Sequence, residues 1–247
     1  MKNPFSLQGK NVLTTGASSG IGRSVAIACA EMGATLIVSG RDHVRLQQTC
    51  NELEGQGHSC IIADLAYERE IKTLADNMNP LDGVVHCAGI NKRIPVTQLS
   101  EKHILELMQT NFVSSVLLSR YLLKGKKLKP EASVVFISSI SVDYPTIGNA
   151  VYCASKGALK SFAKVMALET VESKIRVNCI EPGMIATEWL KKTNMTEEQM
   201  QQAISKYPFK RFGTPMEVAY AAVYLLSDTT RWMTGSVIKL DGGLTLK

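Results

Sequence analysis

The sequence predicts an α/β fold: a doubly wound parallel seven-stranded sheet with helices on both faces. Two observations predict it. Short apolar runs without strict alternation, typical of strands buried on both faces, alternate with longer amphipathic segments. The loops between them are short, which indicates βαβ units with right-handed crossovers. We expect a single domain over residues 1–247, because the strands and helices of one such sheet use up the chain.

Strands and helices are expected to follow one another in order. The short apolar runs place strands at residues 11–15, 35–39, 59–62, 83–87, 133–138, 175–180 and 236–239. The amphipathic segments place helices at residues 20–32, 43–53, 68–77, 100–123, 149–168 and 214–227. The polar, Met- and Gln-rich segment 185–207 fits neither pattern, and an insertion of this length between the last two strands predicts a substrate lid.

Composition excludes several classes of protein. Apolar residues make up 45% of the chain, enough for a core and too much for disorder. There is no apolar stretch long enough to span a membrane, and residues 1–7 lack the apolar centre of a secretion signal. The six cysteines form no C-x-x-C pair and the four histidines are scattered. We therefore expect reduced thiols, no metal site and a cytoplasmic protein that does not bind membranes.

The net charge of +6 does not indicate a nucleic-acid partner. Lys and Arg are spread along the chain, apart from one run at residues 124–129. No basic patch interleaved with aromatic residues accompanies this charge, and such a patch is what nucleic-acid binding would require. We expect no nucleic-acid binding.

The loop after the first expected strand carries three glycines at phosphate-binding spacing. It reads Thr15-Gly16-Ala17-Ser18-Ser19-Gly20-Ile21-Gly22. Glycine lets the backbone turn tightly and approach a pyrophosphate, while the next helix directs its N-terminal N–H groups at the phosphates. At the first βα turn, this pattern predicts a Rossmann fold that binds a dinucleotide. The alternative is a Gly-rich turn without a ligand.

The end of the second expected strand predicts which dinucleotide binds. An acidic residue there holds the ribose 2′-hydroxyl of NAD, whereas an Arg suits the 2′-phosphate of NADP. The sequence has Gly40 at that place and Arg41 next to it, and Arg pairs well with phosphate. We therefore favour NADP (NADPH) over NAD. Asp42 leaves the choice open, because it could pair with Arg41 at the surface.

Tyr152 and Lys156 are four residues apart in an expected helix and share one face. A Tyr phenol, with a pKa of about 10, is a poor acid or base at neutral pH. A neighbouring ammonium favours the phenolate, and an oxidised nicotinamide adds to the effect, so the pair predicts a general acid/base. Ser139, at the end of the fifth strand, could hydrogen-bond a substrate carbonyl. Taken alone, these residues fit a surface pair and a strand-end cap equally well.

Together, the ordered motifs resemble the short-chain dehydrogenase/reductase family, in its single-domain branch of roughly 250 residues. The resemblance extends from Gly9 to Gly243. It rests on the glycine loop 15–22, Asp64, Cys87-Ala88-Gly89, Asn111, Ser139, Tyr152, Lys156 and Pro182-Gly183.

The resemblance implies four catalytic residues. Tyr152 would be the general acid that protonates the developing alkoxide. Lys156 would lower the pKa of Tyr152 and hold the nicotinamide ribose, and Ser139 would polarise the substrate carbonyl. Asn111, inside the fourth long helix, would help to hold a water that links Lys156 to solvent.

The resemblance also implies a nicotinamide dinucleotide, with hydride transfer between its C4 and a carbonyl carbon. Besides Tyr152 and Lys156, the residues expected to bind it are Gly16, Ser18, Ser19, Gly20, Ile21, Gly22, Arg41, Asp64, Leu65, Ala88, Gly89, Pro182, Gly183, Ile185 and Thr187. Glu181 departs from the family pattern, in which a small residue is common. Its carboxylate is expected to turn outward or to pair with a cation.

The substrate class is left open. The chain is most similar in general to 3-oxoacyl-(acyl-carrier-protein) reductases, which implies an acyl-thioester or small-molecule carbonyl substrate; sugar, polyol or other secondary-alcohol dehydrogenases are the alternative. The basic run 124–129 could attract an acidic carrier protein, although a solvated loop is the favoured interpretation. Substrate contacts are expected from residues 90–96, 140–150 and 185–207. These ranges contain Arg93, Asp143, Tyr144 and Trp189.

A catalytically silent NADP-binding sensor or scaffold is the alternative from another class. The complete set of Asn111, Ser139, Tyr152 and Lys156 argues against it. Relatives are commonly tetramers built through the fourth and fifth long helices and the C-terminal segment, so the resemblance implies a homotetramer. Residues 111–123 and 156–168 carry small and apolar side chains on more than one face, as helices buried on both sides do.

Overall fold

All seven strands belong to one parallel sheet. A computed structural model describes residues 3–188 and 196–246, and its strand order is β3-β2-β1-β4-β5-β6-β7. Every neighbouring pair is parallel, and the direction of winding changes between β1 and β4. The doubly wound α/β fold predicted from the sequence is confirmed.

The strands and helices lie within a few residues of their expected positions. The strands are β1 (Asn11–Thr15), β2 (Thr35–Gly40), β3 (Ser59–Ile62), β4 (Leu81–His86), β5 (Leu128–Ile137), β6 (Arg176–Pro182) and β7 (Val237–Leu240). The helices are α1 (Gly20–Glu31), α2 (His43–Asn51), α3 (Glu68–Asp76), α4 (Glu101–Met108), α5 (Ser114–Lys124), α6 (Ala150–Glu169), α8 (Glu197–Ser205) and α9 (Pro215–Leu226). None of the helices in the described part of the chain is long and apolar enough to cross a membrane.

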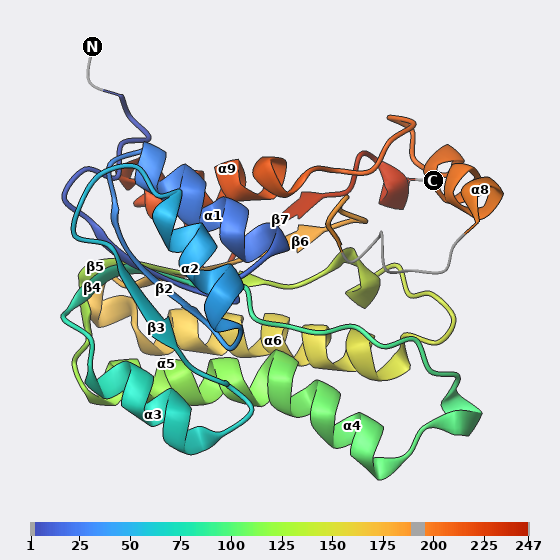
Figure 1. Cartoon of the computed structure of the whole chain (residues 1–247), viewed down its shortest axis with the longest axis horizontal. Helices are drawn as coiled ribbons and strands as arrows, with labels where there is room; N and C mark the ends of the chain where they lie inside the picture. Colours follow the sequence, from blue (N-terminus) through green and yellow to red (C-terminus); the bar gives the residue numbers. More distant parts are fainter. Residues whose placement is uncertain (1–2, 189–195, 247) are drawn as a thin grey trace.

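Helices cover both faces of the sheet, as Figure 1 shows. On one face, Val12 and Val135 pack into a core with apolar residues of α1, α2 and α9. On the other face, their neighbours Leu13 and Val134 pack against α3, α5 and α6. The central strands are therefore buried on both sides, which explains their continuous apolar runs.

The expected helix over residues 100–123 is interrupted. α4 begins after its N-cap, Ser100, and runs into a π-helical turn over Gln109–Val113 (η2), which continues directly as α5. A π turn inserts an extra residue into a helix and frequently occurs at a functional site. This one contains Asn111, so the residue does not lie in a regular α-helix as expected.

Two further segments differ from expectation. β5 starts at Leu128 rather than at residue 133, because Leu128 pairs with Leu81 ahead of a register shift between β4 and β5. The expected lid, 185–207, contains the helix α8, which has a capping box at its N-terminus. Residues 189–195, and Trp189 with them, lie outside the described residues.

Candidate active site

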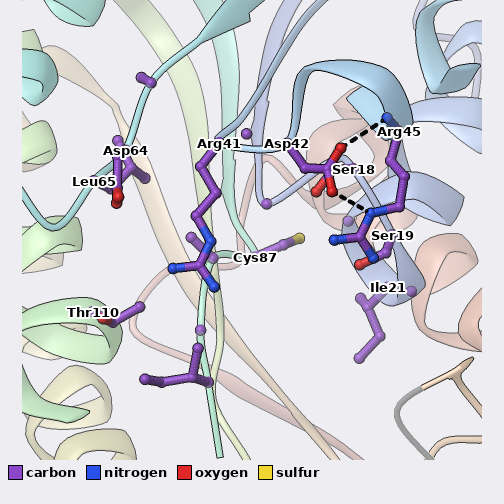
Figure 2. A pocket seen from close by; sticks show the side chains of 18 of the residues that line it. Ser18, Ser19, Ile21, Arg41, Asp42, Arg45, Asp64, Leu65, Cys87 and Thr110 are labelled. Carbon is purple, nitrogen blue, oxygen red and sulfur yellow. Dashed lines mark hydrogen bonds and ion pairs between the residues drawn. The ribbon is translucent and has the colours of Figure 1, made fainter. Parts of the chain in front are cut away.

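A cavity of about 380 Å³ opens at the carboxyl ends of β1 to β4. This is the point where the strand order reverses, and open α/β sheets bind ligands in such a crevice. Its walls come from the loops after β1, β3 and β4, the start of α2, and the segment after β6 (Figure 2). The predicted residues that line it are Gly16, Ser18, Ser19, Gly20, Ile21, Gly22, Arg41, Asp64, Leu65, Ala88, Gly89 and Thr187.

Five predicted cofactor residues do not line this cavity: Tyr152 and Lys156, which lie in α6, and three residues at or after the end of β6. Pro182 ends β6, and the N–H of Gly183 donates to the Leu240 carbonyl at 2.8 Å. Ile185 is buried and pairs with Gly213 in an isolated bridge. These three residues lie at or after the end of β6, whereas the cavity is centred on β1 and its neighbours.

The cavity also has lining residues that the sequence reasoning missed: Gly40, Asp42, Arg45, Ala63, Ala66, Cys87, Ile90, Thr110 and Glu188. Most are direct neighbours of predicted residues. Arg45 carries a signal of its own, because it lies four residues after Arg41 at the start of an expected helix.

The glycines bring main chain against main chain. A Cβ atom at Gly22 would lie only 2.4 Å from the Gly16 carbonyl oxygen, and one at Gly16 would lie 2.8 Å from the nitrogen of Ala88. The Thr15 hydroxyl accepts hydrogen bonds from the N–H groups of Cys87, at 3.2 Å, and Ala88, at 3.3 Å. The glycine loop 15–22 is thus held tightly against the end of β4.

Asp42 pairs with Arg45 and not with Arg41. Its carboxylate caps α2 by accepting from the Arg45 N–H at 3.1 Å, and it also accepts from Arg45 Nε at 2.7 Å. These hydrogen bonds hold the pKa of Asp42 below its usual value. The side chain of Arg41 is exposed and extends into the cavity (Figure 2). No carboxylate in the described part of the chain forms an ion pair with it.

Asp64 fixes the loop after β3 on the other side of the cavity. Its carboxylate accepts from the Ala66 N–H at 3.0 Å, and its own N–H donates to a carboxylate oxygen of Glu70 at 2.6 Å. The neighbouring Leu65 side chain is buried. The loop therefore offers an apolar surface beside a fixed carboxylate.

Asn111 connects the cavity wall to α6, the helix that carries Tyr152 and Lys156. Its fully buried amide accepts from the Ile90 N–H at 2.7 Å, and donates to the Ile90 carbonyl and to the Ser155 hydroxyl, each at 3.0 Å. Ile90 lines the cavity and Ser155 lies in α6. The π turn thus lets one side chain bind both the loop after β4 and α6.

Lys156 is buried beside the same wall. Its ammonium donates to the Ile137 carbonyl at the end of β5, at 2.8 Å. A Cβ atom at Gly89 would lie 3.3 Å from Lys156 Nζ and 3.3 Å from Asn111 Oδ1. Burial lowers the pKa of Lys156 to about 8. Gly89 therefore joins the cavity to Asn111 and Lys156, two of the predicted catalytic residues.

The electrostatics of Tyr152 differ from expectation. Burial raises the pKa of Tyr152, the Ser139 hydroxyl acts in the opposite direction, and Lys156 is not among the groups that shift it. The expected lowering by Lys156 is not found in this structure, where its ammonium donates to the Ile137 carbonyl. Ser139 also caps the following turn by accepting from the Ser141 N–H at 3.1 Å.

The loops expected to contact substrate meet one another. The Ile94 N–H donates to the Gly148 carbonyl at 2.8 Å. Arg93 and Tyr144 are exposed. Asp143 is committed to ion pairs with lysines of α6 and β7.

The chain is similar to known proteins over nearly its whole length. The model of a family described as enoyl-(acyl carrier protein) reductase matches residues 16–245. The chain is 34% identical to a 3-oxoacyl-(acyl-carrier-protein) reductase of Bos taurus over 94% of its length and 96% of the relative. It is 31% identical to gluconate 5-dehydrogenase of Gluconobacter oxydans over 98% and 97%. The solved structure of a short-chain type dehydrogenase/reductase from Mycobacterium ulcerans superposes with a TM-score of 0.90 at 30% identity, over 98% of this chain and 92% of the other.

The fold and the cavity define an oxidoreductase built on a dinucleotide-binding sheet. The chain belongs to the short-chain dehydrogenase/reductase family, and its cofactor is a nicotinamide dinucleotide.

Proposed function

We propose that the protein is an NADP(H)-dependent reductase that converts a ketone to a secondary alcohol. The observation that carries the cofactor assignment is that the two arginines near the start of α2 have different partners. Asp42 is occupied by Arg45, while Arg41 extends into the cavity without a carboxylate partner among the described residues. Gly40, where an NAD site has its acid, brings no negative charge that would repel a 2′-phosphate.

The residues around the cavity fit this dinucleotide. Main-chain N–H groups at the start of α1 and the loop glycines suit the pyrophosphate. Asp64 and Leu65 would hold the adenine, and Lys156 would hold the nicotinamide ribose. When bound, NADPH supplies a hydride to the carbonyl carbon.

Tyr152 would donate the proton in this reaction. Burial raises the pKa of Tyr152, so its phenol carries the proton that the reduction consumes. Ser139, beside the phenol, would hydrogen-bond the carbonyl oxygen and hold it near Tyr152. Asn111 would keep Lys156 and the cavity wall in register through Ile90 and Ser155.

The lid proposed for residues 185–207 is supported by its described parts. Tyr207 is buried, and its hydroxyl accepts from the Met184 N–H at 2.9 Å. Ile204 of α8 packs in the same apolar cluster as Ile140, which directly follows Ser139. α8 thus covers the segment that carries Ser139.

For the substrate, we propose a 3-oxoacyl thioester, with a keto sugar acid as the second candidate. The first rests on relatives named 3-oxoacyl-(acyl-carrier-protein) reductase, and the second on a relative named gluconate 5-dehydrogenase. The basic run 124–129 adds no support for a carrier protein, because it extends from the end of α5 to the start of β5 and so lies at the amino edge of the sheet, opposite the cavity. Within it, Lys127 donates to main-chain carbonyls and Lys129 pairs with Asp82.

The test is a spectrophotometric panel that follows NADPH and NADH oxidation with acetoacetyl-coenzyme A, 5-ketogluconate and a simple ketone. We expect NADPH to be preferred and acetoacetyl-coenzyme A to give the highest kcat/KM. Preference for NADH would overturn the assignment of Arg41, and preference for 5-ketogluconate would select the second substrate. Cofactor binding without turnover of any compound would favour a silent sensor or scaffold.

We also propose a homotetramer. Val165 and Leu168, 53% and 76% exposed, form an uncovered apolar surface on α6, and Ile104 and Leu105 do the same on α4. β7 is an edge strand, and Trp232 just before it is fully exposed. Exposed apolar side chains in such groups are typical of subunit contacts. Light scattering at micromolar concentration is expected to give four times the chain mass, and a monomer would contradict the proposal.

A further inference from the structure

A buried carboxylate lies next to the residues proposed to contact nicotinamide. Glu181 immediately precedes Pro182 at the end of β6, and its side chain is completely buried. Its Oε2 has no hydrogen-bond partner in the described part of the chain. Such a group is costly to bury unless a cation compensates it. Of the two expectations for Glu181, the structure supports pairing with a cation and not an outward-turned carboxylate.

The compensating cation comes from the catalytic helix. Lys160 Nζ lies 3.1 Å from Glu181 Oε1 and 3.1 Å from Asp143 Oδ2. Asp143 belongs to the segment that follows Ser139, and it is also 3.7 Å from Lys239 Nζ on β7. One ammonium therefore joins α6, the end of β6 and the segment after β5.

The position of Lys160 on α6 gives this contact its significance. Tyr152, Lys156 and Lys160 are spaced by four residues and lie on one face of the helix. Lys156 contacts the Ile137 carbonyl on β5, and Lys160 contacts Glu181 on the adjacent strand β6. The catalytic helix is thus attached to two neighbouring strands by two successive lysines.

We propose that Lys160 is a positioning residue for the reaction, an inference that rests on the proposed function. By holding Glu181 and Asp143 together, it fixes α6 and the Ser139 segment against the end of β6. Replacing a buried ion pair by apolar residues is often neutral or stabilising, so stability alone does not require this pair. Its contribution is to the relative placement of Ser139, Tyr152 and Pro182.

The experiment compares four variants with wild type. Lys160→Met leaves Glu181 buried without its cation, and the Tm is expected to fall by roughly 10 °C. The double variant Lys160→Met/Glu181→Leu removes both charges, so it should fold even if the single variant does not. Lys160→Arg keeps the charge. Lys72→Met is the matched control, because Lys72 pairs with Asp76 on the exposed surface of α3.

Two readouts separate positioning from stability: amide hydrogen exchange in residues 139–149, and kcat and KM with NADPH and acetoacetyl-coenzyme A. In the double variant we expect a Tm close to that of wild type, at least tenfold faster exchange, and roughly tenfold lower kcat with KM for NADPH within twofold. Lys160→Arg should keep most of the exchange protection and most of the kcat of wild type. Lys72→Met should match wild type in both measurements.

Wild-type exchange in the double variant would overturn the inference, as would a wild-type kcat. If wild type reduces none of the panel compounds, the proposed function fails. The exchange measurement still decides in that case whether Lys160 couples α6 to the Ser139 segment.

Discussion

The proposed dinucleotide end and the proposed reaction end of the site are held together by different kinds of contact. At the dinucleotide end, main chain contacts main chain: the carbonyl of Gly16 leaves no room for a side chain at Gly22, and Gly16 in turn lies against Ala88. At the reaction end, side chains make the contacts. Asn111 binds Ile90 and Ser155 from elsewhere in the chain, and similar long-range contacts hold Lys156 and Lys160.

This difference determines which kind of substitution damages each end of the site. A site formed by main-chain contacts is distorted when a side-chain atom is added to it, because moving the main chain costs more free energy than moving a side chain. A side-chain network loses its function when a hydroxyl, a charge or an amide is removed, even if the fold survives. The dinucleotide end should therefore be sensitive to larger residues and the reaction end to deletions.

The largest effect is expected from a single deleted oxygen at the reaction end. Tyr152→Phe removes the proposed proton donor and keeps the half-buried ring, so kcat for NADPH-dependent reduction should fall by roughly 10³-fold, within the range for general acid catalysis. NADPH affinity, measured by fluorescence titration, should stay within a fewfold of wild type. If this variant reduces acetoacetyl-coenzyme A as fast as wild type, Tyr152 is not the acid.

The next effect concerns the buried charge of Lys156. Its folded pKa of about 8 lies below the ordinary value of 10.5, so between these values the unfolded chain binds a proton that the folded chain has lost. Stability from this group therefore rises with pH over that interval, by about 3 kcal/mol. Below pH 8 the full cost of the buried ammonium remains.

Lys156→Met lacks this titration. The difference in unfolding free energy between wild type and Lys156→Met, measured by urea denaturation, should shift in favour of wild type from pH 8 to pH 10.5. A difference that stays constant over this range would show that the ammonium is not desolvated.

The same contrast explains what could be predicted from the sequence. The sheet, its helices and the glycine loop depend on local patterns, so periodicity and spacing identified them. Spacing also suggested Tyr152 with Lys156, but the proposed role of Asn111 came only from the family resemblance, since no local rule connects Asn111 to Ser155. The π turn at Asn111 and the Lys160–Glu181 pair depend on packing between distant segments, which leaves no local signature.

Electrostatics at the site could not be predicted for a related reason. Sequence spacing alone suggested that Lys156 lowers the pKa of Tyr152, but the dominant influence is burial, which raises it. Burial depends on the whole fold. In the same way, only the structure shows that Asp42 is taken by Arg45, a question on which the choice between NADP and NAD depends.

At the dinucleotide end, an added methyl group should be the damaging change. Gly22→Ala places a Cβ atom 2.4 Å from the Gly16 carbonyl oxygen, which forces the loop apart. We expect NADPH affinity to weaken by about 3 kcal/mol, roughly a hundredfold, as overpacking does. Gly9→Ala is the control for backbone strain, because Gly9 has a positive φ, which Gly22 does not, and no atom lies within 4 Å of an added Cβ there. An equal loss of NADPH affinity in Gly9→Ala would show that the loss does not depend on the close contact with Gly16.

The smallest effect should come from a removed charge at the same end. Arg41→Ala deletes the guanidinium proposed to bind the 2′-phosphate, and a hydrogen bond to a charged group contributes about 2 kcal/mol. The Kd of NADPH should rise by roughly 30-fold, while the Kd of NADH should change little because it has no such phosphate. Arg45→Ala tests the neighbouring guanidinium, which is held by Asp42, and its effect on NADPH should be smaller. The Kd values are measured by isothermal titration calorimetry. If Arg41→Ala raises the Kd of NADPH and the Kd of NADH by the same factor, Arg41 does not bind the 2′-phosphate.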